Sequence, residues 1–165
     1  MKIKDTKIEH LFALAKILLP AFIKAHKNVL GGRTGIYLAV RRINGTINEP
    51  IEGKILGQLA KEKVSEKQSF AEEKIMRMNS ESNYCSFQSE DENQKQFGGG
   101  IRGTYYYIAP SGFPPHLDQK FALLLAITAG EIRASRYAEI MHASYTKVNY
   151  WRGINGETHI GPSEL

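Results

Sequence analysis

Cysteine is nearly absent from this chain, since Cys85 is the only one among 165 residues. A single cysteine excludes an internal disulfide and suits a reducing compartment. No apolar run reaches the ~18 residues of a membrane-spanning helix. Residues 1–22 are interrupted by Glu9, His10 and Lys16 and lack a small-residue cleavage site, so they predict an amphipathic helix rather than a signal peptide. We therefore expect a cytoplasmic protein without a membrane segment.

Catalytic and metal-binding motifs are also missing. The sequence has no phosphate-loop Lys-Ser/Thr pair and no GxSxG nucleophile motif. Its five histidines are not spaced like metal ligands, and His116 with Asp118 would supply only two. We predict no catalytic residue and no metal ligand, and the sequence leaves open whether the chain is an enzyme.

The net charge of +5 is unevenly distributed. Residues 1–80 have 15 Lys and Arg against 8 Asp and Glu, a balance of +7, whereas residues 81–165 have 7 against 9, a balance of −2. This asymmetry is compatible with an acidic partner. The basic residues are scattered rather than clustered, which favours solvated helix surfaces and disfavours nucleic-acid binding.

Hydrophobic periodicity predicts alternating helices and hairpins. The predicted elements are a helix over 6–26, a strand over 35–43 with a return strand over 46–48, a helix over 66–78, a strand over 84–89, a hairpin over 97–109, and a helix over 116–129 that resumes after Gly130 and continues to about 148. Residues 51–63 fit a helix but contain two glycines, so their state stays open. We expect one α+β domain over 1–148, an antiparallel sheet with flanking helices and an extra C-terminal helix, followed by an irregular tail over 149–165.

The glycine-rich strand that opens the central hairpin is the first part of the candidate site. Gly98, Gly99 and Gly100 have no side chains, which would let a small-molecule ligand approach the backbone. The alternative is a bulged or closely packed strand, which is the usual meaning of glycine within a strand.

An arginine and two tyrosines form the second part of the candidate site. Strand periodicity would place Tyr105 and Tyr107 on one face, and with Arg102 they could bind a planar anionic ligand. The alternative is that one face packs under the helices and the other meets solvent or a partner subunit. His116, at the start of the following helix, completes the predicted ligand-binding set.

Three segments resemble the GlcG/HbpS family, also called the haem-degrading domain family. They are GIYLAVRRINGT after the first helix, the lysine-bearing helix FAEEKIMRMNS, and FGGGI followed by a strand, Ser111-Gly112 and a helix with Asp118 in its first turn. The resemblance implies a profilin-like fold and suggests haem as a cofactor, with His116 or His26 as an axial ligand. The sequence departs from the family at Tyr105-Tyr106-Tyr107, where a second glycine-rich strand is expected.

These observations predict a protein that binds a small molecule or a partner and forms a homo-oligomer. The ligand is not identified by any residue of the chain. Two alternatives remain open, a haem-binding or haem-degrading enzyme and a structural oligomerisation module.

Overall fold

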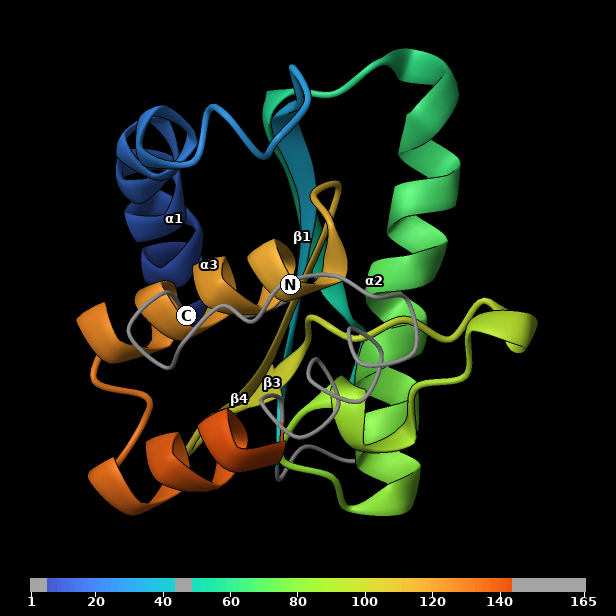
Figure 1. Ribbon diagram of the computed structural model, residues 1–165. Coiled ribbons are helices and arrows are strands. Elements are labelled where there is room, and N and C mark those ends of the chain that lie inside the picture. The colour runs from blue at the N-terminus through green and yellow to red at the C-terminus, as the bar shows by residue number, and fades with distance from the viewer. Residues whose placement is uncertain (1–5, 44–48, 144–165) are drawn as a thin grey trace.

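The computed structural model describes residues 6–43 and 49–143 of the chain (Figure 1). Its elements are α1 (Thr6–Ala25), β1 (Thr34–Arg42), β2 (Glu52–Gln58), α2 (Lys61–Glu81), the short 3₁₀ helices η1 (Ser86–Ser89) and η2 (Glu92–Gln94), β3 (Ile101–Arg102), β4 (Tyr106–Ser111), α3 (Pro115–Thr128) and a helix over 134–143. The strands form one antiparallel sheet in the order β2-β1-β4-β3. The predicted α+β class, with an antiparallel sheet and flanking helices, is confirmed.

The sheet lies between two helical layers, with α1 and α3 on one face and α2 on the other (Figure 1). Alternation along β1 explains this arrangement, because successive side chains of a strand point to opposite faces. Ile36, Leu38 and Val40 belong to the core cluster under α1 and α3. Tyr37 and Ala39 belong to a smaller cluster under α2. Both faces of the central strands are therefore buried.

Several predicted elements are confirmed with small shifts. The strand over 35–43 is β1, and the central hairpin forms with Ile101 opposite Ile108. The helix after the double proline begins at Pro115, where a missing N–H costs nothing in the first turn. A helix does resume after Gly130, at residue 134. The predicted return strand over 46–48 and the tail over 149–165 lie outside the described residues.

The structure decides one state that the sequence left open and corrects two predicted elements. Residues 52–58, left open by the sequence, form β2, because pairing with β1 along their whole length outweighs the weak strand preference of Gly53 and Gly57. The helix predicted over 66–78 starts earlier, at Lys61. The strand predicted over 84–89 is wrong: only Cys85 bridges to Ile101, and a 3₁₀ helix follows.

The side chain of Gln88 explains the break after Cys85. Its Oε1 accepts hydrogen bonds from the backbone N–H groups of Tyr84 and Cys85, at 2.6 and 3.1 Å. These bonds fold the chain back on itself, so the segment cannot continue as a strand. In the part of the chain that the structure describes, no helix combines the length and apolarity needed to cross a bilayer.

Candidate functional site

The glycines of the predicted site are closely packed by protein atoms. A Cβ at Gly98 would overlap the ring of Phe87, and one at Gly100 would lie 2.9 Å from the Cε of Met78. Gly99 adopts φ of 108°, and a Cβ there would lie 2.7 Å from the Cβ of Asp118. The glycines therefore allow other parts of the chain to approach the backbone, which is the packing alternative given above.

The glycine spacing also resembles a nucleotide-binding pattern. Gly98, Gly100 and Gly103 follow GxGxxG, in which a glycine loop normally leads from a strand into a helix that binds phosphate. Here the segment leads through β3 into β4 by a tight antiparallel turn. No helix N-terminus follows the glycines directly, so the spacing does not form a dinucleotide site.

A buried ion pair lies beside Gly99. Lys74, in the middle of α2, places its Nζ 3.2 Å from Oδ2 of Asp118 in the first turn of α3. The same Nζ donates to the backbone oxygen of Pro110, at 2.7 Å. Oδ1 of Asp118 accepts from the N–H of Phe113, at 3.0 Å. The side chains are only 2% and 3% exposed, so the pair joins α2, β4 and α3 across the end of the sheet.

Burial changes the proton affinity of both partners. Desolvation raises the pKa of Asp118 to about 6, against the opposing effects of Lys74 and of hydrogen bonds from Phe113 and Gly112. Desolvation lowers the pKa of Lys74, although the Asp118 carboxylate opposes this. Such shifts occur at catalytic sites, but they also arise in structural ion pairs. Because both groups are almost fully covered, the pair is suited to holding three elements together.

The raised pKa predicts a measurable titration. The chain has only three aspartates, Asp5, Asp91 and Asp118. In protein labelled with ¹³C-aspartate, we expect one carboxyl signal to titrate near pH 6 and to disappear in Asp118→Asn. The native state then holds this proton at pH values where the unfolded chain has lost it. The contribution of Asp118 to stability therefore falls as pH rises from about 4 to about 6, by about 3 kcal/mol. Three signals that all titrate near pH 4 would contradict the shift.

Arg77 is a second buried cation that the sequence did not single out. Its guanidinium binds the Glu73 carboxylate at 2.6 Å, one turn earlier on α2. It also donates to the backbone oxygens of Ser86 and Phe97, both at 2.6 Å, and to Oγ of Ser89 at 3.0 Å. These bonds fasten the loop between α2 and β3 to the helix. The spacing of α2 relates Arg77 to Glu73 alone, since its other partners belong to the loop that follows the helix.

The remaining predicted site residues do not converge. Tyr107 is buried, and its hydroxyl donates to Asn79 on α2 at 3.2 Å. Tyr105 precedes β4, is 55% exposed and lies under the ammonium of Lys7 on α1, at 5.5 Å. The two rings therefore contact helices on opposite sides of the sheet, and the expectation that they share a face is wrong. The reason is that regular strand geometry begins only at Tyr106.

Arg102 and His116, the other two predicted site residues, lie in different parts of the structure. The Arg102 guanidinium lies 5.9 Å from the centre of the Tyr107 ring, so this one predicted contact is present. His116 is half-buried in the first turn of α3. His26, the other candidate for haem, directs Nδ1 toward the Phe22 oxygen at 2.9 Å and packs its ring against Phe22.

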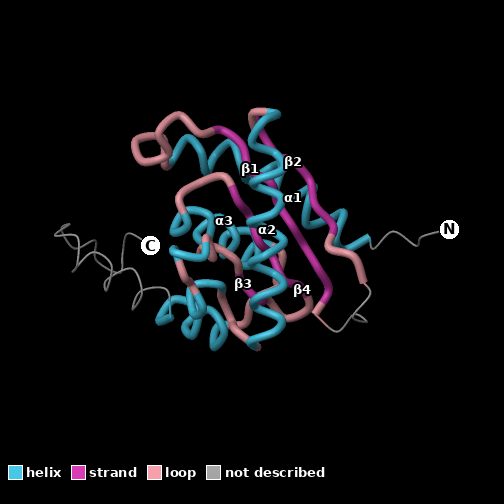
Figure 2. The backbone as a smooth tube through the Cα atoms, turned by 90° about the vertical axis from the view of Figure 1, so that its right-hand side faces the viewer, coloured by secondary structure: helices cyan, strands magenta, loops and turns pink. Residues whose placement is uncertain are grey.

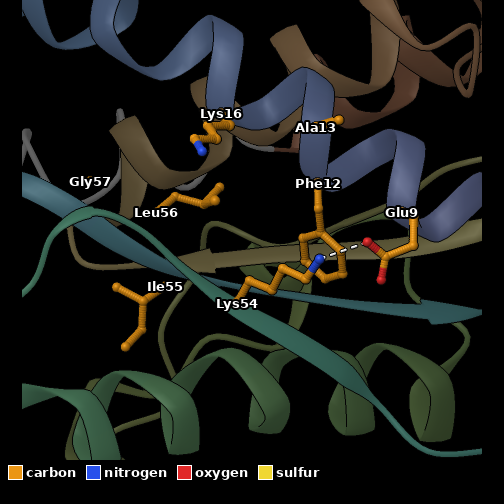
Figure 3. Close-up of a pocket in the computed structure, with 8 residues that line it drawn as sticks. All are labelled: Glu9, Phe12, Ala13, Lys16, Lys54, Ile55, Leu56 and Gly57. Carbon is orange, nitrogen blue, oxygen red and sulfur yellow. Dashed lines mark hydrogen bonds and ion pairs between the residues drawn. The ribbon is translucent and has the colours of Figure 1, made fainter.

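A groove lies at the other edge of the sheet, between α1 and β2 (Figure 3). Its volume is about 440 Å³, within the usual range for small-molecule sites. The groove is lined by Glu9, Phe12, Ala13, Lys16, Lys54, Ile55, Leu56 and Gly57. The sequence did not predict it, because half of its lining comes from β2, whose strand character was left open.

The groove combines an apolar floor with cationic walls. Phe12 and Leu56 are 3% and 6% exposed and form the floor. The Lys54 ammonium lies 4.9 Å from the centre of the Phe12 ring and 2.7 Å from Oε2 of Glu9. Lys16 is exposed one helical turn further along α1, where the chain offers it no ion-pair partner among the described residues. Two lysines against one carboxylate leave this surface positive.

Within 6–43 and 49–143, no group of three or more His, Cys, Asp or Glu side chains is arranged to hold a metal ion. Cys85 is buried and, as the single cysteine of the chain, forms no internal disulfide. Comparison of the chain with family models, with curated proteins and with solved structures finds no match.

Proposed function

We propose that this chain is a binding protein for a small organic anion that has an apolar body, taken up in the groove between α1 and β2. The observation that supports this most directly is the pairing of an apolar floor with two lysines in a groove of suitable volume. Apolar surface contributes most of the affinity in such sites, and a few charged groups orient the ligand. A carboxylate or phosphate group between Lys16 and Lys54 would extend its apolar part over Phe12 and Leu56.

In this proposal the Glu9 carboxylate competes with the ligand for Lys54. This carboxylate occupies Lys54 in the absence of ligand. A bound anion would have to share or displace it, and exposed ion pairs of this kind are weak enough to exchange. Glu9→Gln should therefore strengthen anion binding, whereas Lys16→Gln should weaken it.

We expect octanoate to bind and to shift backbone amide signals of α1 and β2 in ¹⁵N NMR titrations. Each exposed ion pair contributes about 0.2–1 kcal/mol, so Lys16→Gln should weaken binding about two- to fivefold and Glu9→Gln should strengthen it to a similar degree. Lys24→Gln is the matched control, since Lys24 is exposed in the last turn of α1 and does not line the groove. 1-Octanol, with the same chain but no charge, should not distinguish the variants.

The groove proposal would be contradicted if Lys16→Gln, Glu9→Gln and Lys24→Gln all bound octanoate with the same affinity.

Native mass spectrometry of freshly purified protein tests which natural ligand the protein binds. A retained organic acid would support the groove. A retained haem, with binding lost in His116→Ala or His26→Ala, would favour the alternative suggested by the family resemblance.

A further inference from the structure

Two arginines lie in one row across the sheet, on the face that α2 covers. Arg41 of β1 lies directly opposite Tyr107 of β4, and Arg102 of β3 lies opposite the same tyrosine. Directly paired residues of antiparallel strands point to the same face, and Tyr107 belongs to the cluster under α2. Neighbouring strands lie about 4.8 Å apart, so the two arginines flank Tyr107 closely on either side.

Contacts with α2, which runs along β1 and β4 (Figure 2), bring the polar ends of this row together. Nη1 of Arg41 donates to Sδ of Met76 at 3.7 Å, and the Tyr107 hydroxyl donates to Oδ1 of Asn79 at 3.2 Å. Met76 and Asn79 are three residues apart and are therefore neighbours on one side of the helix. The Arg102 guanidinium lies 5.9 Å from the centre of the Tyr107 ring. Both guanidinium groups thus lie beside Tyr107, under the C-terminal half of α2.

Neither guanidinium has an anionic partner in the described part of the chain. Arg41 is only 8% exposed, and a thioether is the one acceptor that its side chain has among those residues. The Arg102 side chain is half-buried and forms no ion pair with any of them. Glu73, the carboxylate one turn before Met76, binds Arg77 instead. Because a buried cation without an acceptor is costly, an anion bound here would stabilise the protein.

We propose that Arg41, Arg102, Tyr107 and Asn79 form a binding site for a phosphate dianion, either free or as the phosphoryl group of a larger molecule. Guanidinium groups offer paired N–H donors that match phosphate oxygens. Two of them balance the charge of about −1.5 to −2 that a phosphoryl group has at pH 7, whereas a carboxylate would balance only one. The Tyr107 hydroxyl and the Asn79 amide add neutral donors.

The site is accessible, and it is separate from the groove. Asn79 is exposed and Arg102 is half-buried, so an anion can approach from solvent along the side of α2. The site lies on the α2 face of the sheet, whereas the groove lies beside α1. The inference does not depend on any ligand in the groove.

Thermal unfolding in inorganic phosphate, compared with chloride at equal ionic strength, tests the site. We expect millimolar phosphate to raise the Tm of the wild type in a saturable manner. Arg41→Met and Arg102→Gln should each raise the dissociation constant for phosphate about tenfold or more, because each removes charge-assisted hydrogen bonds. Arg33→Gln is the matched control and should bind phosphate like the wild type, since Arg33 is exposed just before β1, at the other end of that strand.

Arg41→Met also separates a binding role from a structural one. It replaces an unpaired buried charge by an apolar side chain, so in chloride its Tm should equal or exceed that of the wild type. In phosphate the wild type should have the higher Tm, because it alone gains a bound ligand. Exclusion of phosphate from the protein surface stabilises both proteins alike and does not reverse their order.

Backbone amide shifts in ¹⁵N NMR locate the bound phosphate, which should affect β1, β4 and α2. Tighter binding of phenyl phosphate than of inorganic phosphate would support a phosphomonoester as the ligand, and the reverse order would support free phosphate. The proposal would be overturned if phosphate raised the Tm of Arg41→Met and Arg102→Gln as much as that of the wild type. Shifts confined to α1 and β2, with binding lost in Lys16→Gln, would also overturn it, because they would place the anion in the groove.

Discussion

Lys74→Met is expected to lower the free energy of unfolding by about 3–5 kcal/mol, because it leaves the Asp118 carboxylate buried without its cation. The substitution keeps most of the side-chain volume, so the loss reflects charge rather than a cavity. It also removes the donor to the Pro110 oxygen, which adds to the cost. Urea unfolding followed by circular dichroism measures the change. A loss this large is a substantial fraction of the total stability of a small domain.

The double variant Lys74→Met/Asp118→Leu separates pairing from packing. Replacing a whole buried ion pair by apolar residues is often neutral, so the double variant should recover at least half of the loss of Lys74→Met. Its remaining deficit should be about 1 kcal/mol for the unpaired Pro110 oxygen. If the effects of Lys74→Met and Asp118→Leu simply add, the two side chains are not coupled and the prediction fails.

Gly99→Ala is expected to be nearly as costly. A Cβ at Gly99 would lie 2.7 Å from the Cβ of Asp118, 2.9 Å from the Pro115 oxygen and 3.1 Å from Nζ of Lys74. Lys74 and Asp118 are buried and the Pro115 oxygen belongs to the backbone, so these neighbours cannot move without disturbing the ion pair. The residue also has a φ of 108°, which alanine rarely adopts. We expect a loss of about 2–4 kcal/mol in the same urea experiment.

Gly130→Ala is the matched control for Gly99→Ala. Gly130 also has a positive φ, of 72°, but a Cβ there would meet nothing within 4 Å. Alanine at this position should cost only the conformational strain, about 1–2 kcal/mol. A smaller loss for Gly99→Ala than for Gly130→Ala would mean that close packing at Gly99 does not constrain the sequence.

The buried pair was partly visible in the sequence. Lys74 lies four residues after Phe70 and four before Met78, on the stripe of α2 that the periodicity assigns to the core. A lysine on such a stripe needs a buried partner. Asp118 lies in the first turn of α3, where the helix dipole by itself favours an acidic residue. Nothing in the sequence relates it to a lysine 44 residues away. Only the packing of α2 and α3 at one end of the sheet brings their side chains together.

The groove was less predictable, since it depends on which edge of the sheet β2 occupies. The glycines and tyrosines of the central hairpin attracted attention because glycine and aromatic residues are common in ligand sites. In the structure the Phe87 ring packs against Gly98, and Met78 packs against Gly100. The Tyr107 hydroxyl binds Asn79. These partners come from distant parts of the chain or from other elements. Local composition does not distinguish a glycine that leaves space for a ligand from one against which another part of the same chain packs.

The sequence by itself determined the class of the fold. Alternation along β1, the turn of the central hairpin and the helical spacing of α1 and α3 depend on local backbone geometry and on burial of one side of each element. The tertiary structure decided the state of residues 52–58, the partner of Lys74 and the groove between α1 and β2. These depend on contacts between residues far apart in the chain, whose energies outweigh the small differences in local propensity.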